Sequence, residues 1–112
     1  MTVKDFANSL ELKYWTPDIG LDAVITGGYA GDMLSWVMGR AKEGSVWMTI
    51  MSNQNVAAVA LMADVACVVL TENVQPDNEL VVQANKLGLP VFTSPLSTYE
   101  LSCRLYTLLT NA

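Results

Sequence analysis

The sequence predicts an α/β domain built on a mainly parallel sheet of about five strands, covered by helices on both faces. Short apolar runs alternate along the chain with segments whose apolar residues recur at helical spacing. The run Ala66 to Leu70 carries no charge, as expected for a central parallel strand. Hydrophobic residues make up 52% of the 112 residues, enough for one well-buried core. Residues 1–112 are therefore expected to form a single domain.

The first elements are expected to be a helix and a short edge strand. A helix is predicted from Thr2 to Leu10, where Thr2 and Asp5 have the spacing of a capping box. Apolar and polar residues then alternate from Leu10 to Tyr14, which indicates an edge strand. The segment Thr16 to Gly20 has the composition of a turn.

A glycine-rich segment follows. The apolar run Ala23 to Ile25 predicts a strand, and Thr26-Gly27-Gly28 predicts a tight turn at its carboxyl end. A helix is expected from Asp32 to Lys42, with Asp32 as its N-cap and Gly44 just beyond its end.

The remaining chain continues the alternation of strands and helices. A capping box is predicted over Ser97 to Glu100, Pro76 has the position of a first helical residue, and Gly88 ends that helix. The other expected elements are strands at Val46 to Met51, Ala66 to Leu70 and Val91 to Thr93, and helices at Val56 to Ala63 and Thr98 to Leu109.

Charge and composition exclude several classes of function. The net charge is −5 and the six basic residues are scattered singly, so nucleic-acid binding is not expected. No signal peptide and no apolar run long enough to span a bilayer is visible, so a cytoplasmic protein without a membrane partner is expected. The chain has no histidine, and no metal or cofactor site is expected. Cys67 and Cys103 are interpreted as two buried thiols.

Small polar residues follow the predicted strands at the edge where parallel α/β sheets bind ligands. Each precedes a helix whose first amides are free to donate, which favours a site for a small polar or anionic ligand. The alternative is that Ser52, Asn53, Asn55 and Ser97 only cap helices. Tyr29 could stack on a ligand or cover the edge of the sheet. The candidate ligand-binding residues are Thr26, Gly27, Gly28, Tyr29, Asp32, Ser52, Asn53, Asn55, Thr71, Glu72 and Ser97.

No catalytic residues are predicted. The chain has no P-loop, and the glycine segment does not have the spacing of the dinucleotide-binding fingerprint. Ser35 and Ser45 lack a nearby base that would activate them.

The three tryptophans and the low charge bear on self-association. Trp15, Trp36 and Trp47 are expected in the core, with the alternative that Trp36 faces outward as an interface anchor. Charged residues are only 15% of the chain, which is typical of a subunit that buries surface against a second copy. A homodimer is therefore expected.

Several segments in a fixed order carry a family resemblance over about 85 residues. They are Ile25 to Tyr29, Asp32 to Met38, Ala41 to Gly44, Trp47 to Ile50, Asn55 to Ala60, Val69 to Glu72 and Leu96 to Leu101. On these segments the chain resembles a DRTGG domain. The family name describes Asp-Arg-Thr-Gly-Gly, but here Val24 and Ile25 precede Thr26-Gly27-Gly28, so no role of that charged pair can be transferred.

The resemblance implies a three-layer α/β/α domain similar to the N-terminal domain of HPr kinase/phosphorylase. Stand-alone copies are often labelled HPr serine kinases, but the P-loop kinase domain is missing from this sequence. Related domains accompany CBS pairs in regulated pyrophosphatases or precede phosphotransacetylase domains, where they look like regulatory, dimer-forming modules.

The sequence thus predicts a non-enzymatic regulatory or adaptor domain, homodimeric, that senses a nucleotide or a phosphorylated metabolite. Two alternatives stay open. One is a protein-interaction subunit of a redox or phosphotransfer system, bound to a partner enzyme without any ligand. The other is a phosphotransfer component related to serine kinases.

Overall fold

The computed structural model describes residues 1–111, in which five helices and five strands follow one another. In chain order they are α1 (Val3–Ser9), β1 (Lys13–Tyr14), β2 (Gly27–Ala30), α2 (Leu34–Arg40), β3 (Ser45–Thr49), α3 (Asn55–Ala63), β4 (Cys67–Leu70), α4 (Asn78–Leu87), β5 (Val91–Thr93) and α5 (Thr98–Thr110).

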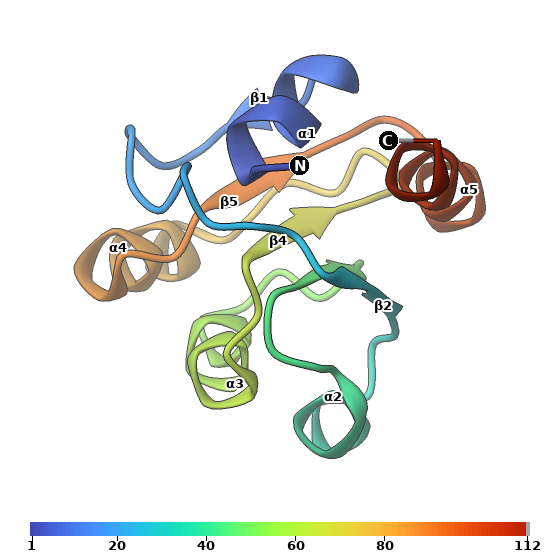
Figure 1. Ribbon diagram of the computed structural model, residues 1–112. Coiled ribbons are helices and arrows are strands. Elements are labelled where there is room, and N and C mark those ends of the chain that lie inside the picture. The colour runs from blue at the N-terminus through green and yellow to red at the C-terminus, as the bar shows by residue number, and fades with distance from the viewer. Residues whose placement is uncertain (112) are drawn as a thin grey trace.

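The strands form one sheet in the order β1-β5-β4-β3-β2. Strands β2 to β5 are parallel, and β1 pairs antiparallel with β5. The predicted five-stranded, mainly parallel sheet is thus confirmed. Because β2, β3, β4 and β5 succeed one another across the sheet, the helices that connect them, α2, α3 and α4, share one face (Figure 1).

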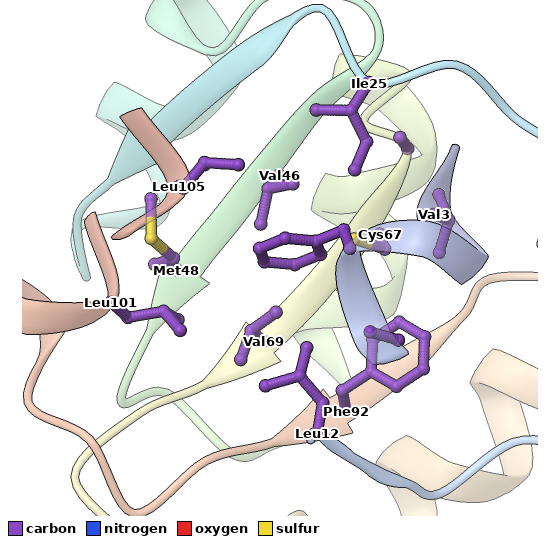
Figure 2. Close-up of a cluster of buried hydrophobic side chains, with 13 residues drawn as sticks. Val3, Leu12, Ile25, Val46, Met48, Cys67, Val69, Phe92, Leu101 and Leu105 are labelled. Carbon is purple, nitrogen blue, oxygen red and sulfur yellow. The ribbon is translucent and has the colours of Figure 1, made fainter. Parts of the chain in front are cut away.

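Helices α1 and α5 cover the opposite face, so the domain has three layers (Figure 1). The core under α1 and α5 packs Val3, Leu101 and Leu105 against Val69 and Phe92 of the sheet (Figure 2). The second core packs apolar residues of α2, α3 and α4 against Trp47, Val68 and Leu70. Every residue of β3 and β4 is buried, because both faces of these central strands are covered.

Local signals place several helix ends where the sequence predicts them. Thr2 and Asp5 form the complete capping box of α1. Ser97 caps α5 by accepting a hydrogen bond from the Glu100 amide, at 3.1 Å. Its reciprocal half is missing, because the Glu100 carboxylate accepts from Arg104 instead, at 3.0 Å. Gly88 ends α4 in the left-handed conformation (φ +71°) that glycine adopts without strain.

Several predicted boundaries are wrong. The edge strand is only Lys13–Tyr14, because Leu10 still belongs to the end of α1, and β3 ends at Thr49 instead of Met51. Helix α4 begins at Asn78, two residues after Pro76. Helix α2 is shorter than expected and begins after Met33, which makes no side-chain capping bond. It ends at Arg40, and Gly44 lies in the turn before β3 with a φ of +80°.

The strand predicted over Ala23 to Ile25 is also wrong. In that segment Val24 makes only an isolated bridge with Thr2. The strand is the glycine segment itself, in which Gly27 pairs with Ser45 and Ala30 with Met48. Neither Gly27 nor Gly28 has a positive φ, so the expected tight turn is absent from this segment. Glycine has low strand propensity, and here the pairing with β3 overrides it.

Trp36 and Cys103 were expected in the core but lie at the surface, whereas Trp47 and Cys67 are buried as expected. Trp47 is fully buried and donates from its indole to the Gly31 carbonyl, at 2.9 Å. Trp36 is 53% exposed, with the Arg40 guanidinium 4.2 Å from its ring centroid. Cys67 is buried, and burial raises the pKa of its thiol, whereas Cys103 is exposed. The expectation of two buried thiols therefore holds only for Cys67.

Candidate functional site

The predicted site residues lie in two different parts of the sheet. Because β2 begins at Gly27, and Gly27 pairs with the first residue of β3, Thr26 and Gly27 lie at the amino ends of the strands. The other polar candidates follow strands and lie at the carboxyl ends. The sequence prediction placed both groups together because it placed the strand before the glycines. The structure brings together only the second group.

Asp32 lies at the carboxyl edge, but it does not cap α2. Its Oδ1 atom accepts hydrogen bonds from the Thr49 hydroxyl, at 2.8 Å, and from the Ile50 amide, at 2.9 Å. The carboxylate therefore joins the loop after β2 to the end of β3. A ligand that used Asp32 would have to share the carboxylate with these two donors.

The candidates after β3 are bonded to neighbouring loops and helices. Ser52 donates from its hydroxyl to the Asp77 carboxylate, at 3.2 Å, which joins the loop before α3 to the start of α4. The Asn53 side-chain oxygen accepts from the Asn55 amide in the first turn of α3, at 2.9 Å. The Asn53 contact is local to the start of α3, as the capping interpretation expects, whereas Ser52 joins two loops and caps no helix amide.

The carboxyl end of β4 is covered by the loop that leads from β5 to α5. The amide of Glu72 donates to the Leu96 carbonyl, at 2.8 Å, and the Glu72 carboxylate accepts from the Thr98 amide at the start of α5, at 3.1 Å. The Thr71 and Thr98 hydroxyls are hydrogen-bonded to each other. Among residues 1–111, no buried side-chain nitrogen or oxygen lacks a hydrogen-bond partner. The polar groups of this edge thus satisfy one another.

Strand β2 is one of the two edge strands of the sheet, and a hollow lies on each side of it. The hollow toward α5 is about 470 Å³ and mostly apolar, and it includes Leu105 and Tyr106. The hollow toward α2 is about 460 Å³ and includes Arg40 and Lys42. Thr26, Gly27 and Gly28 line both hollows.

The two glycines of β2 face opposite surroundings. A Cβ atom on Gly28 would lie 2.7 Å from Leu105 Cδ2 and 3.2 Å from Met48 Cε, so Gly28 lets α5 pack closely on the sheet. A Cβ atom on Gly27 would have no atom within 4 Å. Packing therefore explains Gly28 and leaves open space at Gly27.

Sequence reasoning missed Arg40 and Lys42, which it interpreted as isolated bases. The signal in the sequence was that two basic residues are separated by only one residue. It indicates a cationic site only once the glycine segment is known to be the strand beside them.

Other kinds of site find no support in the described part of the chain. Within residues 1–111, no three potential metal ligands lie close enough together to hold an ion. None of the helices in this range is both long and apolar enough to cross a membrane.

Comparisons with known proteins identify the family. The chain is similar to a solved structure of the CBS and DRTGG domains of the regulatory region of Clostridium perfringens pyrophosphatase, complexed with the activator diadenosine tetraphosphate. The TM-score is 0.75 at 15% sequence identity, and the match covers 93% of this chain and 45% of that one, so this chain spans less than half of that structure. No curated protein matches the sequence.

The family model for the DRTGG domain matches residues 30–108. That match begins within β2 and so does not include Thr26, Gly27 or Gly28. It confirms the resemblance drawn from the sequence and covers well over half of the chain, which therefore belongs to the DRTGG domain family.

Proposed function

We propose that this chain is a regulatory domain, without enzymatic activity of its own, that senses a small anionic metabolite such as a nucleotide or a phosphorylated compound. One observation carries the proposal. Nearly the whole chain, 93% of it, matches the fold of a regulatory region that was solved with a dinucleotide activator. A domain of this kind changes the behaviour of a partner because the ligand binds its conformations with different affinities.

The chemistry of the carboxyl edge supports a role other than catalysis. Asp32 and Glu72 accept hydrogen bonds from backbone amides, and the Thr71 hydroxyl is bonded to Thr98. These groups hold loops together and would have to break existing bonds in order to react. The buried Cys67 thiol, whose pKa is raised by burial, is a poor nucleophile.

Homodimerisation is part of the proposal. Large apolar side chains lie exposed on α2 and α3, among them Trp36 (53% exposed) and Met62 (70% exposed). Contact with a second copy would remove them from water. Sedimentation equilibrium at several concentrations measures the mass directly, and a monomer at all of them would remove dimerisation from the proposal.

Thermal-shift measurements and calorimetry on the full chain test the sensing function. The panel contains nucleoside mono-, di- and triphosphates, dinucleoside polyphosphates and phosphorylated sugars. A ligand at 100 times its Kd should stabilise the fold by about 2.7 kcal/mol. We expect at least one compound to do so without being consumed. If no anion stabilises the protein at millimolar concentration, the sensing function is wrong.

A second candidate is an interaction subunit of a redox or phosphotransfer system. The open edge of β2 and the exposed Trp36 favour it, because both are surfaces that a protein partner can use. Co-purification of a partner enzyme that is unaffected by every anion in the panel would support this candidate over the first. Transfer of labelled phosphate from ATP to a protein serine by this chain alone would instead identify a phosphotransfer component.

A further inference from the structure

The hollow between β2 and α2 combines open space with positive charge. Its volume is about 460 Å³, and its lining includes Gly27 and Tyr29 from β2 and Arg40, Lys42 and Glu43 from the end of α2 and the following turn. A group of the size of a phosphate or diphosphate fits this volume.

Neither cation of the hollow has an acidic partner. In the part of the chain that the structure describes, residues 1–111, the one ion pair joins Arg104 to Glu100. Arg40 and Lys42 thus form no ion pair, and together with Glu43 they leave the lining of the hollow positively charged, although the chain as a whole has a net charge of −5. Two such cations beside one hollow attract an anion, and guanidinium binds phosphate with two parallel hydrogen bonds.

The backbone that carries these cations is held in place. The Thr26 hydroxyl donates to the Glu43 carbonyl, at 2.7 Å, and the Ser45 hydroxyl donates to the Lys42 carbonyl, at 2.6 Å. Trp36 lies against the guanidinium of Arg40, with 4.2 Å from the guanidinium carbon to the ring centroid. These contacts reduce the ordering that a bound anion would have to impose.

Gly27 leaves open space beside the two cations. No atom lies within 4 Å of the place where its side chain would begin. The Thr26 amide donates to the Gly44 carbonyl, at 3.0 Å, which holds the backbone just before this space. A ligand can therefore approach the backbone closely at Gly27.

We infer that this hollow is a binding site for the phosphate group of a small phosphorylated metabolite, held by Arg40 and Lys42 in the open space beside Gly27. The inference rests on the proposed sensing function and places it at β2 instead of at the carboxyl edge. The Glu43 carboxylate in the same hollow opposes the bound anion and lowers its affinity.

The test uses inorganic pyrophosphate as the probe, titrated into the isotope-labelled chain of 112 residues at low ionic strength while amide chemical shifts are followed. We expect saturable shifts at Gly27, Arg40 and Lys42. Arg40→Gln and Lys42→Gln should each weaken binding about tenfold, as loss of a charge-assisted hydrogen bond does. Lys86→Gln on the exposed face of α4 removes the same charge elsewhere and should leave binding unchanged.

Two further variants separate the site from a general effect of charge. Gly27→Val places its Cβ where no atom lies within 4 Å and fills the open space, so it should abolish binding while the spectrum of the folded protein is retained. Glu43→Gln should tighten binding about twofold to threefold, because it removes the opposing charge.

The outcomes distinguish this inference from the proposed function. One outcome is saturable binding that shifts the amides of Glu72 and Ser97 and is unchanged by the three variants Arg40→Gln, Lys42→Gln and Gly27→Val. This outcome would overturn the inference and leave the sensing function intact. Absence of binding by pyrophosphate and by every anion of the wider panel would overturn both. Equal weakening by Lys86→Gln would show nonspecific attraction and would also overturn the inference.

Discussion

The carboxyl edge of the sheet and the hollow beside β2 are two polar regions of opposite kinds. At the carboxyl edge, the polar side chains form hydrogen bonds with neighbouring loops and helix starts. These side chains are Asp32, Ser52, Thr71 and Glu72. Beside β2, Arg40 and Lys42 have no acidic partner within residues 1–111. A cluster of polar residues is thus weak evidence for a ligand until its internal hydrogen bonds have been counted. The same comparison makes the smaller, cationic cluster the stronger candidate.

Substitutions at the two glycines of β2 should give the largest difference in stability. Gly28→Val places a side chain within 2.7 Å of Leu105 Cδ2 and should destabilise the fold by about 2 kcal/mol or more. Gly27→Val, one residue earlier and facing open space, should change stability little. Urea unfolding of both variants measures the difference. Equal loss in the two would contradict the assignment of Gly28 to packing and Gly27 to the hollow.

Asp32 tests the structural character of the carboxyl edge. Asp32→Ala leaves the Thr49 hydroxyl and the Ile50 amide without their acceptor and should cost about 1–2 kcal/mol of stability. Asp18→Ala, in an exposed turn, is the matched control and should be neutral within about 0.5 kcal/mol. An unchanged unfolding midpoint for Asp32→Ala would mean that this carboxylate is free for a ligand after all.

The hydroxyl pair at the end of β4 gives a smaller effect. Thr71→Val keeps the shape of the side chain but removes the bond to the Thr98 hydroxyl, at an expected cost of about 1 kcal/mol. Thr107→Val on the exposed side of α5 makes the same chemical change without breaking a side-chain hydrogen bond and should cost less. Thermal unfolding of both variants checks the order. Pyrophosphate binding at the β2 hollow should be unaffected in either one.

Asp5 lies in neither region, and its substitution should have the smallest effect on stability. Hydrogen bonds from the backbone and the side chain of Thr2 lower the pKa of the Asp5 carboxyl below its ordinary value. Its contribution to stability is therefore present above that ordinary value, about pH 4, and is lost as the pH falls through the lowered pKa. Asp5→Asn should flatten the stability curve in that acidic window and slightly lower the stability near pH 7, where the slope stays unchanged. A curve that keeps its slope in the acidic window would show that the capping box carries no charge effect.

Sequence alone determined the features that depend on a few neighbouring residues. The capping box of Thr2 and Asp5, the cap at Ser97 and the end of α4 at Gly88 are local, because each joins atoms within one helical turn. The strands β3, β4 and β5 were visible because fully buried parallel strands are apolar runs. These elements sufficed for the fold class and for the family.

Tertiary structure alone decided where the polar groups meet. Gly27 and Gly28 form a strand because β3 pairs with them and α5 packs on Gly28, and both partners lie elsewhere in the sequence. Because the strand begins at Gly27, Thr26 and Gly27 lie at the amino end of the sheet. Arg40 and Lys42 line the hollow beside them. Strand pairing and close approach are long-range interactions, so the residues that share a site could not be chosen from local pattern.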